Sequence, residues 1–307
     1  MSDEAARNLR SFDGAVAIVT GGASGIGAAL GRELARRGAR IILADRQLEV
    51  ASEVAKSIND TGGKAEAVEL DVRDAIAFDA IVMLTIERFG RIDYLFNNAG
   101  IAIGGEIREY RLDDWRDVVD VNLMGVVHGV QAAYGRMIAQ GFGHIVNTAS
   151  VAGLLPSPFM GSYTTTKHAV VGLSRALRAE GARYGVRTST LCPGVIRTPI
   201  LTGGRFGRMA QPMDPGLALK MWEQLRPIEP EEFARRALNL VADNRGIIIV
   251  PGWWRLISWL NGTAPRLFEH TVALGLKRLM EQVLKPGAPP SRRSVEGTRD
   301  VRARAGS

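Results

Sequence analysis

The chain has 307 residues, which by the rule of roughly 150 residues per domain allows two domains, although open α/β sheets often exceed that length as one domain. The formal net charge is +7, yet no nucleic-acid recognition motif accompanies it, so the composition does not favour a nucleic-acid-binding protein. The single cysteine, Cys192, excludes an intrachain disulfide, and the four histidines, at 128, 144, 168 and 270, lack the spacing of metal ligands.

Apolar, strand-like segments alternate with helix-like segments along most of the chain. The predicted strands are residues 15–20, 40–45, 65–71, 91–97, 143–149, 186–192 and 246–250. This alternation predicts an α/β fold of three layers, with a parallel sheet covered by helices on both faces. No other internal repeat is evident in the sequence.

The first predicted strand leads into a glycine-rich turn and then a helix, Thr20-Gly21-Gly22-Ala23-Ser24-Gly25-Ile26-Gly27. Such a turn forms an anion site, because bare backbone and unpaired N–H groups can approach a pyrophosphate. The spacing T-G-x-x-x-G-x-G differs from the common G-x-G-x-x-G fingerprint, and a turn that only packs the helix on the sheet is the alternative. The second strand favours the dinucleotide, because it ends in Asp45, where a ribose 2′-hydroxyl would lie.

Tyr163 and Lys167 stand four residues apart, and Ser150 lies thirteen residues before the tyrosine. On a helix, positions i and i+4 share a face. A tyrosine alone titrates near pH ~10, and a neighbouring positive charge would lower the pKa of its phenol. Ser150 ends an apolar run and would place a hydroxyl at the mouth of a buried strand. The three groups suit proton transfer to or from an alcohol or carbonyl oxygen, and a chance pairing of tyrosine and lysine on one helix is the alternative.

Taken in order, these motifs resemble those of the short-chain dehydrogenase/reductase family over residues 12–251. The matching residues are Thr20 to Gly27, Asp45, Asp71-Val72, Asn97-Asn98-Ala99-Gly100, Asn122, Ser150, Tyr163, Lys167 and Pro193-Gly194. The resemblance implies a single-domain, Rossmann-like, doubly wound sheet. It also implies an oxidoreductase that acts on CH–OH groups with a nicotinamide dinucleotide.

The resemblance further implies a catalytic set of Asn122, Ser150, Tyr163 and Lys167, and no metal is predicted because the histidines lack ligand spacing. Tyr163 would be the acid/base, and Ser150 would hold the substrate oxygen beside it. Lys167 would lower the pKa of the phenol and bind the nicotinamide ribose, while Asn122 would support a water through which the proton leaves. The implied cofactor-binding residues are Gly21, Ser24, Gly25, Ile26, Gly27, Asp45, Arg46, Asp71, Val72, Asn98, Ala99, Gly100, Tyr163, Lys167, Pro193, Gly194, Ile196 and Thr198.

The charge of Asp45 bears on the choice between NAD and NADP. A carboxylate can accept hydrogen bonds from a 2′-hydroxyl but repels a 2′-phosphate, by about 4 kcal/mol at ~4 Å and an effective dielectric near 20 before screening. The glycine turn carries no arginine or lysine, whereas Arg46 follows Asp45 directly and could offset part of the repulsion. NAD is favoured, and NADP remains the alternative.

The segment after Pro193-Gly194 bears on the substrate. Residues 195–228 correspond to a flap over the substrate in the family, and they are rich in apolar side chains and methionine. This content suggests a pocket for a small apolar alcohol or ketone, with simple packing of the flap on the domain as the alternative. The loop of residues 101–105 is expected to form the facing wall.

The last 57 residues, from Pro251, hold ten Lys and Arg and four acids, a net charge of +6. The segment Gly252 to Leu260 contains Trp253, Trp254 and Trp259, and a helix-like run follows from Leu267 to Leu284. No window reaches ~18 uncharged apolar residues, so no membrane span is predicted. Tryptophans beside basic residues suit a helix on a membrane surface, and the alternative is that they cover the substrate cleft or a subunit contact.

The predicted organisation is an N-terminal tail (1–11), a dehydrogenase domain (12–251), an apolar and basic helical extension (252–285) and a disordered basic tail (286–307). The polar start, Met1-Ser2-Asp3-Glu4, is unlike a signal peptide and predicts a cytoplasmic protein, with peripheral membrane contact left open. The expected assembly is a homodimer or homotetramer without nucleic acid. A non-catalytic nucleotide-binding regulatory or membrane-surface protein on the same fold is the alternative, and the complete catalytic set argues against it.

Overall fold

The computed structural model describes residues 9–201, 206–210 and 222–283. By internal contacts the chain divides into two compact units, Met1–Ala264 and Pro265–Ser307. The first unit contains the sheet and extends beyond the predicted domain limit at residue 251. In the second unit the structure describes one helix, α11 (Pro265–Val283).

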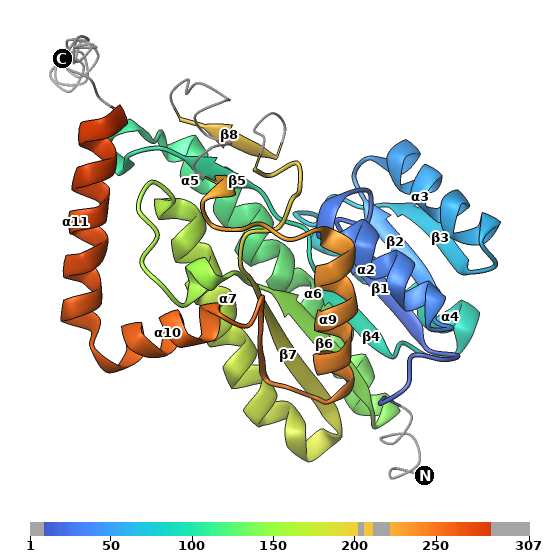
Figure 1. Ribbon diagram of the computed structural model, residues 1–307. Coiled ribbons are helices and arrows are strands. Elements are labelled where there is room, and N and C mark those ends of the chain that lie inside the picture. Colours follow the sequence, from blue (N-terminus) through green and yellow to red (C-terminus); the bar gives the residue numbers. More distant parts are fainter. Residues whose placement is uncertain (1–8, 202–205, 211–221, 284–307) are drawn as a thin grey trace, which may run out of the picture. The chain divides into compact units, whose positions relative to one another are not determined.

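Seven parallel strands form the central sheet of the first unit (Figure 1). Their bounds are β1 (Val16–Thr20), β2 (Arg40–Asp45), β3 (Lys64–Glu69), β4 (Tyr94–Asn97), β6 (Gly143–Thr148), β7 (Val186–Pro193) and β9 (Ile247–Val250). The strand order is β3-β2-β1-β4-β6-β7-β9. Three of these strands, β1, β4 and β6, are buried along their whole length, as expected for parallel strands that are covered on both faces.

Helices cover both faces of this sheet. Their bounds are α2 (Gly25–Arg36), α3 (Leu48–Asp60), α4 (Ala75–Phe89), α5 (Leu112–Val119), α6 (Gly125–Gln140), α7 (Gly161–Gly181), α9 (Pro230–Ala242) and α10 (Trp254–Thr263). Shorter turns are the 3-10 helices η1 (Ile107–Glu109), η3 (Val151–Gly153) and η4 (Ala182–Tyr184) and the π-helical turn η2 (Asp120–Met124).

Two hydrophobic cores lie on opposite sides of the sheet. Helices α2, α3 and α9 share one core with Ala17 and Val19 of β1, whereas α4, α6 and α7 share the other with Val16 and Ile18. Successive strand residues point to opposite faces, so each strand contributes to both cores. The predicted three-layer, doubly wound α/β fold is confirmed.

The direction in which successive strands are added to the sheet reverses between β1 and β4, which are parallel neighbours. From β1 the chain proceeds outward through β2 and β3, and it then returns to β4 on the other side. In open parallel sheets the crevice at such a switch point, beyond the carboxyl ends of the strands, is where ligands bind.

The sequence did not predict a second sheet of two short parallel strands, β5 (Ala102–Gly104) and β8 (Gly207–Met209). The backbone N–H of Ala102 donates to the Phe206 carbonyl at 2.8 Å, and that of Ala210 donates to the Gly104 carbonyl at 2.7 Å. The predicted facing wall and the described part of the predicted flap therefore pair directly. Flap residues 202–205 and 211–221, like the tails at 1–8 and 286–307, lie outside the described residues.

Candidate active site

The glycine turn after β1 is fitted so closely that side chains are excluded from it. Gly21 has φ +68°, and a Cβ there would lie 2.9 Å from the Cα of Ala99. A Cβ at Gly27 would overlap the carbonyl oxygen of Gly21 and lie 2.7 Å from the Asn98 side-chain nitrogen. The turn, the start of α2 and the loop after β4 thus meet with bare backbone between them.

The N-terminus of α2 points its unpaired N–H groups into this region, because the first turn of a helix has no internal partners for them. The N-cap residue, Ser24, makes no capping hydrogen bond with its side chain. A Cβ at Gly25 would lie 3.1 Å from the Thr198 methyl, so Thr198 borders the same turn, whereas Ile26 packs partly buried against the core. This backbone cradle fits the pyrophosphate of a dinucleotide.

Asp45 ends β2 beside the turn and is buried. Its Oδ2 accepts a hydrogen bond from the Ala23 N–H at 3.1 Å, and its Oδ1 accepts one from the Gln47 N–H at 2.9 Å. These two hydrogen bonds hold the carboxylate in place. Each of its oxygens retains a further lone pair, so the group can still accept a hydrogen bond from a ribose hydroxyl.

Three other predicted cofactor-binding residues, Arg46, Asp71 and Val72, differ in exposure and in the groups that they contact. Arg46 is exposed, and its guanidinium lies 6.0 Å from the centre of the Phe206 ring at the edge of the flap. Asp71 accepts a two-pronged ion pair from Arg73, which lowers the pKa of its carboxyl group. Val72 is buried, and its carbonyl oxygen lies 2.9 Å from Nδ1 of His128.

The loop after β4 is anchored by Thr20, a residue whose side chain the sequence analysis did not single out. The Thr20 hydroxyl accepts hydrogen bonds from the backbone N–H groups of Asn98 at 2.9 Å and Ala99 at 3.1 Å. The Asn98 side chain donates in turn to the Thr20 carbonyl at 3.1 Å. These bonds fix the loop that leads to Gly100.

Asn122 lies fully buried in the π-helical turn η2, a type of turn often found at functional sites. Its side chain accepts from the Ile101 N–H at 2.8 Å and donates to the Ile101 carbonyl at 2.9 Å. A Cβ at Gly100 would lie 3.3 Å from the Asn122 oxygen and 3.5 Å from the Lys167 Nζ. Asn122, Gly100 and Lys167 therefore adjoin one another.

Tyr163 and Lys167 share one face of α7, as predicted, with Nζ lying 5.4 Å from the centre of the phenol ring. Lys167 is buried, and its Nζ donates to the Thr148 carbonyl at the end of β6, 2.8 Å away. Ser150 caps the turn η3 just beyond the same strand, where its Oγ accepts from the Ala152 N–H at 3.1 Å. The hydroxyl, the phenol and the ammonium are thus brought together at the carboxyl end of β6.

The electrostatics of this group differ from the sequence prediction in one respect. Burial raises the pKa of the Tyr163 phenol, a hydrogen bond with Ser150 lowers it, and the net change is upward. Burial also lowers the pKa of Lys167 to about 8, and the nearby Cys192 thiol partly opposes this. In the protein alone, desolvation therefore decides the direction of the phenol's pKa, and the lowering of that pKa by Lys167 stays a prediction.

The turn after β7 is covered by α10. The Gly194 N–H donates to the Val250 carbonyl at 2.9 Å, and a Cβ at Gly194 would overlap the Trp254 indole. The Asn261 side chain of α10 donates to the Leu154 carbonyl at 3.1 Å, just beyond η3. One helix of the predicted extension thus contacts both the turn after Pro193 and the loop after Ser150, and no sequence motif predicted either contact.

The remaining predicted residues lie next to this region. Ile196 is buried and pairs with Ile228 in an isolated bridge, and its carbonyl accepts from the Thr198 hydroxyl at 3.3 Å. Cys192 is buried in β7, and burial raises the pKa of its thiol to about 12. The described residues hold no group of three His, Cys, Asp or Glu side chains that could bind a metal.

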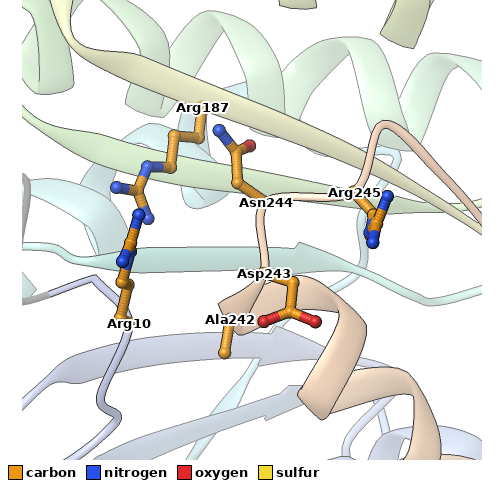
Figure 2. A pocket seen from close by; sticks show the side chains of 6 residues that line it. All are labelled: Arg10, Arg187, Ala242, Asp243, Asn244 and Arg245. Atoms are coloured by element: carbon orange, nitrogen blue, oxygen red, sulfur yellow. The ribbon is translucent and has the colours of Figure 1, made fainter.

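A separate hollow of about 520 Å³ lies among residues at the amino ends of β1 and β7 and in the turn before β9 (Figure 2). It is lined by Arg10, Arg187, Ala242, Asp243, Asn244 and Arg245. None of the predicted site residues contributes to it, because those residues follow the carboxyl ends of the strands.

Comparisons with known proteins agree with this geometry. A family model described as short chain dehydrogenase matches residues 15–205. A cyclohexanol dehydrogenase of an Acinetobacter species is 34% identical over 244 residues, which cover 77% of this chain and 91% of that protein.

Two solved structures have a similar fold. A short-chain dehydrogenase/reductase from Burkholderia phymatum, in complex with NAD, has a TM-score of 0.73 and 31% identity, with 92% of this chain and 99% of that chain covered. Levodione reductase has a TM-score of 0.70 and 32% identity, with 78% of this chain and 96% of that chain covered.

Proposed function

Because the chain belongs to the short-chain dehydrogenase/reductase family of oxidoreductases, we propose that it interconverts a lipophilic secondary alcohol and its ketone with NAD. The convergence of Ser150, Tyr163 and Lys167 at the carboxyl end of β6 carries this proposal. It supplies a proton donor, a hydrogen-bond donor and a cation within one small region beside the glycine turn.

When bound, the nicotinamide ring would supply or accept the hydride. In the reducing direction, the Tyr163 phenol is protonated at neutral pH, as an ordinary phenol is, and burial raises its pKa further. That proton passes from Oη to the substrate oxygen, and the Ser150 hydroxyl donates a hydrogen bond to the same oxygen. In the oxidising direction, the tyrosine takes the proton back while the Lys167 ammonium stabilises negative charge near the ring.

The proposed dinucleotide-binding residues have two roles. The backbone of Gly21, Gly25 and Gly27 and the N-terminus of α2 would hold the pyrophosphate, and Asp45 would accept from the adenosine ribose. Repulsion between the buried Asp45 carboxylate and a 2′-phosphate favours NAD over NADP. The Arg46 guanidinium, which could soften this repulsion, lies near the Phe206 ring.

The substrate proposal is a small apolar alcohol or ketone. The described flap residues Phe206 and Met209 are apolar, and the similar cyclohexanol dehydrogenase acts on a cyclic secondary alcohol. A panel of aliphatic, alicyclic and steroid-like alcohols, each assayed with NAD and with NADP, tests substrate and cofactor together. We further propose a homodimer or homotetramer, which light scattering would measure.

Tyr163→Phe tests the acid/base role most directly. It keeps the ring and removes the proton, so turnover should fall at least ~10²-fold, whereas NAD binding measured by calorimetry should persist. Tyr184→Phe, at an exposed tyrosine, is the matched control and should keep full turnover. Near wild-type alcohol oxidation by Tyr163→Phe would refute the mechanism.

A further inference from the structure

Helix α10 and its N-cap residue carry large exposed apolar side chains on the side opposite the buried Trp254. At about 100° per residue, four of them fall within one arc of the helix. They are Trp253, Leu256, Trp259 and Leu260, with exposed fractions of 41%, 62%, 61% and 43%. This arc, the outward face of α10, is a contiguous apolar surface of the kind that marks an interaction site.

The opposite arc of α10 carries polar atoms against the fold. Trp254 is only 9% exposed and lies on Gly194, and Asn261 donates to the Leu154 carbonyl. The buried Trp254 Nε1 and Ser258 Oγ have no hydrogen-bond partner in the described structure. A surface helix ordinarily buries its apolar side and exposes its polar side. Apart from Trp254, α10 instead leaves most of its large apolar side chains exposed, so its outward face is suited to an apolar environment other than its own domain.

The charged residues that flank α10 in the sequence are all basic. Between Asn244 and Phe268 the sequence contains no Asp or Glu, and its charged residues are Arg245, Arg255 and Arg266. Arg255 lies on α10, and Arg266 follows shortly after it; both are exposed. Tryptophans with apolar rings and N–H groups, flanked by arginines, suit the boundary layer of an anionic bilayer.

A second copy of the chain fits this face less well. A two-fold contact would place the outward face of α10 against itself, so that Arg255 would approach its own symmetry mate. No carboxylate on α10 could pair with that charge, because the helix contains no acidic residue. An anionic lipid surface offers both the apolar layer and the opposite charge, and the +6 of the last 57 residues adds to the attraction.

We propose that the outward face of α10 docks the protein on the surface of anionic phospholipid bilayers. The helix would lie in the plane of the surface with its tryptophan and leucine side chains among the lipids. This geometry is consistent with the described helices, none of which is long and apolar enough to cross a membrane. The inference does not depend on the chemistry proposed for the active site.

Sedimentation of the full-length protein with vesicles tests this docking. One set of vesicles contains phosphatidylcholine and phosphatidylserine, and the other contains phosphatidylcholine alone. The double variant Trp253→Ser/Trp259→Ser removes apolar area without changing charge, and Leu256→Glu places a negative charge in the middle of the face. The matched control, Ile76→Ser/Leu84→Ser, removes two exposed apolar residues from α4.

The wild type and the control should sediment with the anionic vesicles, and either α10 variant should bind at least about tenfold more weakly. A wild type that ignores anionic vesicles would overturn the proposal. Binding that falls with salt but is unchanged in both variants would also overturn it, because the basic tail would then account for the attraction. If the variants instead lower the oligomer mass in light scattering while vesicles are ignored, the face contacts a second copy. Because the altered residues are exposed, an unchanged melting temperature serves as the folding check.

Discussion

Replacing Lys167 by methionine should separate what this buried charge does for the site from what it does to the fold. The side chain is 3% exposed, and its Nζ donates to a single backbone carbonyl, that of Thr148, at 2.8 Å. No carboxylate is paired with it in the described structure. Burial lowers its pKa from the ordinary 10.5 to about 8, so the charged form is disfavoured in the folded protein.

The size of this effect follows from the gap between the two pKa values. It corresponds to about 3 kcal/mol of lost folding free energy at pH values below 8, where the ammonium is charged in both states. Methionine has a similar length and no charge, but it leaves the Thr148 carbonyl unpaired, at a cost of about 1–3 kcal/mol. We therefore expect the free energy of unfolding of Lys167→Met at pH 7 to be about 1 kcal/mol higher than that of the wild type. Its turnover should be lost.

The sign of the pH dependence is the sharper test. Because the folded pKa lies below the unfolded one, the unfolded chain binds more protons between pH 8 and 10.5, and the wild type gains stability as pH rises. The variant lacks this gain, so its advantage should shrink by about 3 kcal/mol across that window. Tyr163 and Cys192, whose pKa values are raised on folding, lower stability at alkaline pH in both proteins. The Tyr163 contribution largely cancels in the difference, whereas loss of the Lys167 charge raises the pKa of Cys192 further.

Urea unfolding of the protein without dinucleotide, at a series of pH values from neutral to alkaline, measures this difference. Lys56→Met is the matched control, because Lys56 is exposed on α3 beside Asp60 and its loss should give no comparable trend. If Lys167→Met were destabilised by the same amount at every pH, the lysine would be stabilising the fold, and the reasoning above would be wrong.

Two other substitutions test the dinucleotide site. Asp45→Ala should narrow the advantage of NAD over NADP in kcat/KM by about tenfold, the loss of a charge-assisted hydrogen bond of roughly 1–2 kcal/mol, and an unchanged ratio would show that the acid does not contact the ribose. Gly27→Ala should abolish NAD binding in calorimetry, because its Cβ would overlap the Gly21 carbonyl. Gly172→Ala on α7, where a Cβ meets nothing within 4 Å, should instead leave binding intact and add about 0.5–1 kcal/mol of stability. If Gly27→Ala and Gly172→Ala changed NAD binding equally, the turn around Gly27 would not be as closely fitted as described.

Strands such as β1 and β2 were predictable because each is a short apolar run between turns, buried on both faces of the sheet. The predicted segment 186–192, for example, corresponds to β7, Val186–Pro193. The pair β5 and β8 was not predictable in this way. Each has three residues, and they lie about a hundred positions apart in the chain, so no local periodicity marks them.

The candidate site divides along similar lines. Residues such as Asp45 and Ser150 are predictable because they follow strands, and parallel topology brings the carboxyl ends of neighbouring strands to one edge. The backbone carbonyl that holds Lys167 carries no sequence signal, since any residue at Thr148 would provide it. The direction of the phenol's pKa could not be predicted from the sequence either, because it depends on how far burial outweighs the hydrogen bond with Ser150.

The tryptophans of α10 show how little adjacency in sequence says about environment. Trp253 and Trp254 are neighbours whose rings stack with centres 4.2 Å apart, yet the first is half exposed and the second is buried on Gly194. A bilayer that contacts Trp253 would therefore contact the residue stacked on Trp254, which in turn packs on Gly194 in the turn after Pro193. If the substrate is lipophilic, it concentrates in the same bilayer. Docking through α10 would then hold the proposed active site next to its substrate supply, with one helix contacting both.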